Sequence, residues 1–295
     1  MDNNLRILII EGNTSDGNAA MAAAGLGSNA AQYAAAVHLS ASDAEITFAY
    51  PTDHTDALPQ GVSLADFDGV ILGGSGLHVR AQENAPEVQR QVDLVRAVFD
   101  AGRPLLGSCW GLQVAVIAAG GDVGPSPNGR EVGVCRDITL SDMGTDFPMF
   151  ASKPRVFNSL AIHYDEVTKL PSGARVLAVN GHSPIQAAAF EVGRGVFWGV
   201  QYHPEFTLSH MALLIRRYGS DMVKQGIFPD HTAMDRETDV MLRMDGASAS
   251  GSNSDDVEFA PLAAELGIDR MITDPVNRCR EIDNWLQFCG SEKAG

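Results

Sequence analysis

One of the four cysteines in this sequence lies in a pattern that suits a catalytic nucleophile. The run Gly107-Ser108-Cys109-Trp110-Gly111 joins an apolar, strand-like stretch to a helical one. In a nucleophile elbow of the form G-x-nucleophile-x-G, small flanking residues let the backbone turn sharply and let the outgoing helix pass closely. The amino end of that helix would favour the thiolate form of Cys109. A buried structural cysteine between two incidental glycines is the alternative, and the motif alone leaves both interpretations open.

A second segment could supply the base that such a nucleophile needs. His203-Pro204-Glu205 follows a strand-like run at 195–201, and ligands of open α/β sheets bind at the carboxyl ends of the strands. A catalytic base also needs an acceptor that fixes its tautomer. Pro204 keeps the segment extended, so His203, as the base, and Glu205, as the residue that orients it, can project to the same side. A surface histidine in a turn is the alternative, which we favour for an isolated His-Pro-Glu but not beside a cysteine elbow.

Acyl transfer also requires hydrogen-bond donors for the tetrahedral oxyanion. The amide N–H of Trp110, just after the nucleophile, is one expected donor. The loop at 73–76 (GGSG) ends another strand-like run at the same edge, and it can supply a second donor, which we assign to Gly74. The competing interpretation of this loop is a tight exit from a strand.

Alternating strands and helices are expected to position these motifs. Short apolar runs bounded by polar or turn residues predict strands at 5–10, 45–50, 69–72 and 103–107. Helical periodicity predicts helices at 30–39, 86–101 and 112–119. This alternation indicates a parallel sheet covered on both faces. The stretch 11–26 is expected to be a long loop at the active-site edge.

The second half of the chain is predicted to be richer in antiparallel strands. Runs separated by turn residues lie at 133–140, 155–157, 161–167, 174–179, 185–190 and 195–201, and a helix is expected at 208–224. We therefore predict one α/β domain over residues 1–225 and a C-terminal extension over 226–295. Within the extension, 247–256 has the composition of a flexible Ser/Gly-rich linker. A terminal helix is expected at 276–288, with Asp274 as its N-cap and Pro275 at its first position.

Composition limits the classes of protein to consider. Of the 295 residues, 45% are hydrophobic and 20% charged, which excludes a wholly disordered or fibrous protein. The formal net charge of −16 argues against binding to nucleic acid or anionic membranes. No signal peptide and no apolar run of about 20 residues is recognisable. We therefore expect neither secretion nor a membrane span. The cysteines have no paired spacing and the histidines no metal-ligand spacing, so reduced thiols in the cytoplasm and no metal are expected.

Taken together, the elbow, the upstream glycine loop and His203-Pro204-Glu205 resemble the class I (triad) glutamine amidotransferases. The spacing and order of the motifs are similar over residues 5–225, and His163 and Asp165 loosely match a further segment of that family near its glutamine pocket. The resemblance implies a flavodoxin-like fold with a parallel or mixed sheet, helices on both faces and a C-terminal helical extension. It also implies Cys109, His203 and Glu205 as catalytic triad, no cofactor, and these substrate-binding positions: Gly73, Ser75, Gln113, Ser159 and His163.

The expected reaction is hydrolysis of a γ-glutamyl amide through a γ-glutamyl thioester on Cys109. We favour a free-standing hydrolase for a γ-glutamyl conjugate of an organic amine. One alternative is the ammonia-donating glutaminase component of a two-chain amidotransferase, which would need a synthetase as partner protein. Another is a non-catalytic binding or regulatory module, against which the intact triad argues. The sequence leaves the amine, the partner, homo-oligomerisation and the role of the extension open.

Overall fold

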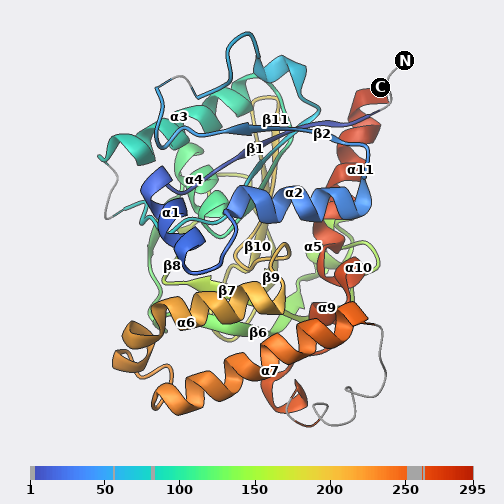
Figure 1. Ribbon diagram of the computed structural model, residues 1–295. Coiled ribbons are helices and arrows are strands. Elements are labelled where there is room, and N and C mark those ends of the chain that lie inside the picture. Colours follow the sequence, from blue (N-terminus) through green and yellow to red (C-terminus); the bar gives the residue numbers. More distant parts are fainter. Residues whose placement is uncertain (1–3, 56, 81–83, 251–260, 262, 295) are drawn as a thin grey trace.

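A nine-stranded mixed sheet forms the centre of the molecule in the computed structural model, which describes residues 4–55, 57–80, 84–250, 261 and 263–294 (Figure 1). In spatial order its strands are β2 (Glu45–Ala49), β1 (Arg6–Ile10), β3 (Gly69–Leu72), β4 (Leu105–Ser108), β11 (Gly195–Val200), β10 (Ala187–Val192), β9 (Arg175–Val179), β6 (Glu131–Leu140) and β7 (Val156–His163). The first five strands in this order are parallel to one another. Each of the next four is antiparallel to the strand before it. The predicted flavodoxin-like α/β fold is confirmed. A separate two-stranded sheet pairs β5 (Asp122–Pro125) with β8 (Asp165–Lys169).

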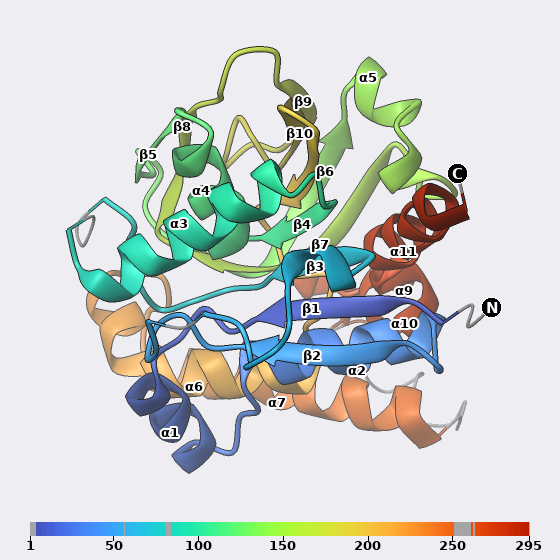
Figure 2. The same cartoon turned by 90° about the horizontal axis from the view of Figure 1, so that it is seen from above.

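Helices cover both faces of the parallel half, as Figure 2 shows. On one face α3 (Pro86–Asp100) and α4 (Trp110–Ala118) pack on the side chains of β1, β3 and β4 that point toward them. On the other face lie α2 (Asn29–Ser40) and the C-terminal α11 (Arg280–Ala294). Every residue of β3 and β4 is buried, as expected for strands covered on both sides.

Further helices surround the rest of the sheet. They are α1 (Ser15–Ala23), α5 (Asp142–Thr145), α6 (Leu208–Lys224), α7 (His231–Ser250), α9 (Arg270–Thr273) and α10 (Pro275–Arg278), with 3-10 turns η1 (Leu64–Asp66) and η2 (Pro148–Phe150). Helices α6 and α7 share an apolar cluster that also takes in Met21 of α1. Of the helices in the described part of the chain, none is both long and apolar enough to cross a membrane.

Two segments differ from the sequence prediction. The expected loop at 11–26 contains α1, whose alanine-rich sequence has no apolar stripe but is N-capped by the Thr14 side chain, which accepts from the Gly17 amide. The strands expected at 155–157 and 161–167 are instead a continuous β7, followed by β8. The polar residue Asn158 does not break β7, because its side chain accepts a hydrogen bond from the Asp137 amide at a bulge in β6.

The C-terminal segment is helical and packs against the sheet. Helix α7 continues through Ser250, so the first four residues of the predicted linker 247–256 have helical backbone, and the rest lie outside the described residues. In place of the single terminal helix expected at 276–288, α10 and α11 follow one another, and Asp274 caps α10 as predicted. Along α11, Phe288 stacks on Trp198 of β11 with ring centroids 4.8 Å apart, and Trp285 is fully buried.

A substitution at Gly69 tests how tightly α11 is seated. A Cβ at this position of β3 would lie 2.5 Å from Trp285 and 2.8 Å from the Cys289 sulfur, so Gly69→Ala should destabilise the protein by about 1–3 kcal/mol through overpacking. The matched control is Gly290→Ala on α11 itself, where an added Cβ meets nothing within 4 Å and helix propensity should rise. Urea unfolding of both variants measures the difference, and equal stability would contradict the described seating of α11.

Candidate active site

Cys109 occupies a sharp turn between β4 and α4. Its φ of 50° and ψ of −102° are rare for a residue with a side chain. The two glycines of the motif are required by space, because a Cβ at Gly111 would lie 1.9 Å from the Leu72 carbonyl oxygen and one at Gly107 would lie 2.7 Å from Gly111. The turn therefore has the geometry of a nucleophile elbow.

The structure brings His203 and Glu205 together behind this turn. The His203 Nδ1 atom lies 2.8 Å from Glu205 Oε1, and both side chains are buried. The Ser108 hydroxyl donates to the same carboxylate oxygen at 3.3 Å. The Phe206 ring stacks on the imidazole, with centroids 4.0 Å apart and planes within 1°. Apart from its interaction with Cys109, His203 Nε2 is unpaired among the described residues, so it is available to exchange a proton.

Charges around the imidazole favour its protonated form. Burial opposes the charge, but the Glu205 carboxylate and the hydrogen bond with Cys109 outweigh burial and raise the pKa of His203 to about 10. The neighbouring His210 has no carboxylate partner among the described residues, and burial together with the charge of His203 lowers its pKa to about 4. The two histidines on either side of Phe206 therefore carry opposite shifts.

Side chains from the end of β1 and from α2 hold the glycine loop in place. The Asn13 side-chain oxygen accepts from the Gly76 amide at 2.9 Å and from the Ser75 hydroxyl at 3.2 Å. The Asn29 amide donates to the Gly74 carbonyl at 2.8 Å. A Cβ at Gly74 would lie 2.7 Å from the His203 ring, so only glycine lets the loop approach the imidazole this closely.

Buried Glu11 fixes the start of this network. Its two carboxylate oxygens accept from the Asn13 and Ala30 amides, each at 3.0 Å. Burial raises the pKa of Glu11, and these backbone hydrogen bonds limit the rise. The carboxylate thus joins the end of β1 to the first turn of α2.

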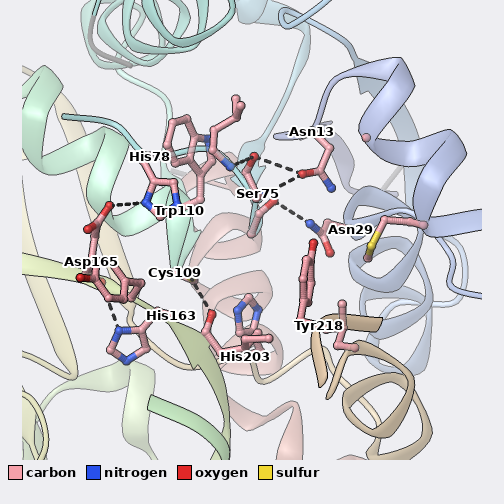
Figure 3. Close-up of a pocket in the computed structure, with 18 of the residues that line it drawn as sticks. Asn13, Asn29, Ser75, His78, Cys109, Trp110, His163, Asp165, His203 and Tyr218 are labelled. Atoms are coloured by element: carbon pink, nitrogen blue, oxygen red, sulfur yellow. Dashed lines mark hydrogen bonds and ion pairs between the residues drawn. The ribbon is translucent and has the colours of Figure 1, made fainter. Parts of the chain in front are cut away.

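A cavity of about 430 Å³ opens above Cys109 and His203. In Figure 3, His78, Asp165 and His163 lie on one side of it and Asn13, Asn29 and Tyr218 on the other. Five of the predicted site residues besides the nucleophile and base line it: Gly74, Ser75, Trp110, Gln113 and His163.

Three predicted site residues lie outside the described lining of the cavity. Glu205 is behind His203, as its expected role requires. The Gly73 carbonyl accepts from the Gly111 amide at 3.1 Å, and Ser159 faces Cys135 in the β6–β7 pair. For Gly73 and Ser159, contact with a substrate stays a prediction.

The side of the cavity around β7 carries a chain of polar contacts. His163 is held at both ring nitrogens, by the Asp165 carbonyl at 3.1 Å and by the Glu131 carboxylate at 2.9 Å. Burial opposes the charge of Glu131, but the hydrogen bond and charge of His163 outweigh it and lower the pKa of Glu131 to about 2. The Asp165 side chain pairs with His78 at 2.8 Å, and this hydrogen bond raises the pKa of His78.

Sequence reasoning missed several residues of the site. Asn13 follows the first predicted strand directly, so the rule that ligands bind at strand ends could have identified it. His78 and Asn29 gave no comparable signal, because their contacts are made with distant segments of the chain. Arg130 and Tyr218 also line the cavity. Among the described residues, no group of three or more His, Cys, Asp or Glu side chains is placed to hold a metal ion.

Comparisons with known proteins agree with this geometry. A family model described as "Glutamine amidotransferase class-I" matches residues 28–218. A γ-glutamyl-L-1-hydroxyisopropylamide hydrolase from a Pseudomonas species is 31% identical over 287 residues, which cover 93% of this chain and 95% of the relative. A glutamine-hydrolysing GMP synthase subunit from Methanocaldococcus jannaschii is 30% identical, over 58% of this chain and 78% of its own.

Solved structures support the fold. A glutamine amidotransferase from Thermotoga maritima superposes with a TM-score of 0.58 at 18% identity, over 89% of this chain and 98% of its own. One from Methylobacillus flagellatus has a TM-score of 0.56 at 17% identity and covers 97% of this chain and 94% of its own.

The pKa of His203 predicts how stability depends on pH. The folded protein holds a proton on this group up to about pH 10, against a usual value of 6.5. The resulting stabilisation is complete below pH 6.5 and is lost as the pH rises through 10. In His203→Asn, the fall in unfolding free energy over this range should be smaller than in the wild type, as urea titrations at several pH values would show.

His210→Asn is the matched control for that experiment. With a pKa of about 4, His210 is neutral in both folded and unfolded protein over most of this range, so its replacement should change the stability but not its slope with pH. Equal slopes for wild type and His203→Asn would contradict the described electrostatics.

Proposed function

Because this chain belongs to the class I glutamine amidotransferases, we propose that it hydrolyses the γ-glutamyl conjugate of a small organic amine to glutamate and the free amine. The observation that carries the proposal is the extent of the cavity, which continues past His203 between α1 and α6. Release of ammonia from glutamine needs no such space, whereas a larger amine needs a wall of side chains to contact.

Acylation would begin at the thiolate of Cys109. Its sulfur attacks the δ-carbonyl carbon, the carbonyl electrons move to oxygen, and the N–H groups of Gly74 and Trp110 stabilise the oxyanion. When the oxyanion collapses, the C–N bond breaks and His203 gives its proton to the departing nitrogen. The products of this step are the free amine and a γ-glutamyl thioester on Cys109.

Deacylation would use the same groups in reverse. His203, now neutral, takes a proton from a water molecule as that water attacks the thioester carbonyl. The C–S bond then breaks, which releases glutamate and returns the thiolate and imidazolium. Glu205 would hold the ring orientation through both steps, as its 2.8 Å contact with Nδ1 supports.

The two substituents of the amide carbonyl must leave the reacting carbon in different directions. The nitrogen has to face His203 to be protonated. The glutamyl chain then extends toward β7, where His163 lies and where the Gln113 amide donates to the Asp165 carbonyl. Arg130 also lines the cavity, close enough to His78 for its charge to limit the rise in the pKa of that ring, and it is suited to the substrate α-carboxylate. We therefore assign the β7 side to the glutamyl group.

The amine would then lie between α1 and α6. Four residues of α6 line the cavity at positions i, i+3, i+4 and i+7, which is one face of a helix: Leu214, Arg217, Tyr218 and Asp221. Helix α1 and its N-cap contribute Thr14, Gly17 and Met21.

This wall is apolar at depth and polar toward the opening. Met21, Phe206 and Leu214 are buried, whereas Arg217 and Asp221 are exposed. The Tyr218 hydroxyl faces the glycine loop, since a Cβ at Gly76 would lie 3.9 Å from it. An amine with a few apolar carbons next to nitrogen and a polar group further out would suit these contacts.

Similarity to the Pseudomonas hydrolase supports this assignment, because it extends over nearly the whole chain and that relative's name specifies a γ-glutamyl conjugate of a hydroxylated alkylamine. The similarity to the archaeal GMP synthase protein favours the second candidate, a glutaminase that supplies ammonia to a partner synthetase, but it leaves about two fifths of the chain unmatched. Substrate preference of the isolated protein separates the two.

We expect the purified protein to turn over γ-glutamyl alkylamides and hydroxyalkylamides with higher kcat/KM than glutamine. Cys109→Ala should reduce turnover at least about a thousandfold, because no other group can form the thioester. Release of glutamate, followed with a coupled dehydrogenase, measures both. Activity retained in Cys109→Ala would contradict the mechanism, and preference for glutamine that rises with an added synthetase would favour the second candidate.

The contacts assigned to the amine between α1 and α6 predict a change in selectivity. In Tyr218→Phe, the ratio of kcat/KM for a hydroxyalkylamide to that for the matching alkylamide should fall about five- to tenfold, since one hydrogen bond is lost. Exposed Ser220 of the same helix is not among the described lining residues, so Ser220→Ala should leave the ratio unchanged. An unchanged ratio in Tyr218→Phe would place the amine elsewhere.

A further inference from the structure

The segment just before the catalytic histidine is contacted from behind by the C-terminal part of the chain. The Tyr202 hydroxyl donates to Glu281 Oε1 at 2.5 Å, and the Cys279 thiol contacts the Pro204 carbonyl at 3.4 Å. Tyr202 and Pro204 flank His203 on both sides. Residues of the C-terminal segment therefore touch the backbone or side chain of the two nearest neighbours of the catalytic base.

Glu281 is held in this place by a buried ion pair. Its carboxylate contacts the Lys153 ammonium, and the two side chains are 0% and 2% exposed. The ammonium also lies 4.4 Å from the Phe157 ring centroid and 5.8 Å from that of Tyr202. Burial lowers the pKa of Lys153, and the charge and hydrogen bond of Glu281 counter this shift. Removal of either partner would leave the other charge buried and unpaired.

The pair also lies within electrostatic reach of the triad. Burial raises the pKa of Cys279 to about 11, and the charges of both Glu281 and Glu205 add to this rise. The thiol of Cys279 thus lies near two buried carboxylates, one in the triad and one in the C-terminal segment. Cys279 therefore lies between the triad carboxylate and the ion pair of the C-terminal segment.

We infer that Glu281 is a positioning residue, which fixes Tyr202 and through it the orientation of the His203–Glu205 pair. The buried side of the C-terminal segment from 279 onward then supports the catalytic histidine from behind. This inference rests on the proposed function only for its first readout, which is turnover.

Four variants test the role of the pair. Glu281→Gln keeps the shape but removes the charge, Tyr202→Phe removes only the hydroxyl, and Lys153→Met/Glu281→Gln removes both charges together. The control is Asn284→Ala, in the helix that also carries Glu281, α11. The Asn284 amide donates to the Met149 and Ala151 carbonyls, at 2.9 and 3.0 Å, and has no described hydrogen bond to residues 202–205.

The measurements are made at a temperature where circular dichroism shows each variant folded. Glu281→Gln and Tyr202→Phe should lower kcat about ten- to a hundredfold with KM within about twofold, since the base is displaced but the other residues that line the cavity are not. Because the contact with Glu205 raises the pKa of His203, a looser His203–Glu205 contact should also move the alkaline limb of the pH–rate profile of Glu281→Gln to lower pH. The charge-balanced double variant should move that limb back toward the wild-type position. Asn284→Ala should lower only the melting temperature.

The rate of Cys109 alkylation by iodoacetamide, measured against pH, gives a second readout that needs no substrate. If the wild type hydrolyses no γ-glutamyl amide, the proposed function fails, yet altered alkylation profiles in Glu281→Gln and Tyr202→Phe but not in Asn284→Ala would still support the inference. Variants that melt earlier but keep wild-type kcat and alkylation profiles would overturn it and leave the ion pair a purely structural contact.

Discussion

The site depends on the backbone turn at Cys109, which is held in a conformation that side-chain-bearing residues rarely adopt. Such a conformation costs about 1–3 kcal/mol and persists only where the surroundings fix it. Here the Cys109 amide donates to the Val200 carbonyl of β11 and the Gly111 amide to the Gly73 carbonyl after β3. The two strands that flank β4 therefore hold the turn from both sides. The absence of side chains at Gly107 and Gly111 lets strand, turn and helix approach closely.

The same three strands determine where the other groups of the site lie. Strand β3 leads into the glycine loop, β4 into the nucleophile and β11 into His203 and Glu205, all at one edge of the parallel sheet. Burial at this edge makes charge interactions strong, which is why the Glu205 carboxylate and Cys109 together can shift the pKa of His203 so far. Behind it, the buried contact of Glu281 with Lys153 and Tyr202 connects the C-terminal segment to the same edge.

Local patterns predicted much of this arrangement. Apolar runs and turn residues located the strands of the parallel half, and two motifs far apart in the chain placed Cys109, His203 and Glu205 at one edge. Helix α1 was missed because its alanine-rich sequence has no apolar stripe. Strand β7 was predicted as two shorter strands, because the hydrogen bond that accommodates Asn158 within it comes from a bulge in another strand. His78 with Asp165 and Lys153 with Glu281 join segments 87 and 128 residues apart, and no periodicity within a window can reveal such pairs.

In the proposed mechanism, the Cys109 sulfur carries a γ-glutamyl group during turnover. Rapid acid quench of the enzyme with a γ-glutamyl alkylamide, followed by mass spectrometry of the intact protein and of its peptides, tests this directly. A transient glutamyl adduct is expected on the peptide that contains Cys109. It should form with release of the amine and decay as glutamate appears. Steady turnover with no adduct under conditions that preserve thioesters, or an adduct on another residue, would contradict it.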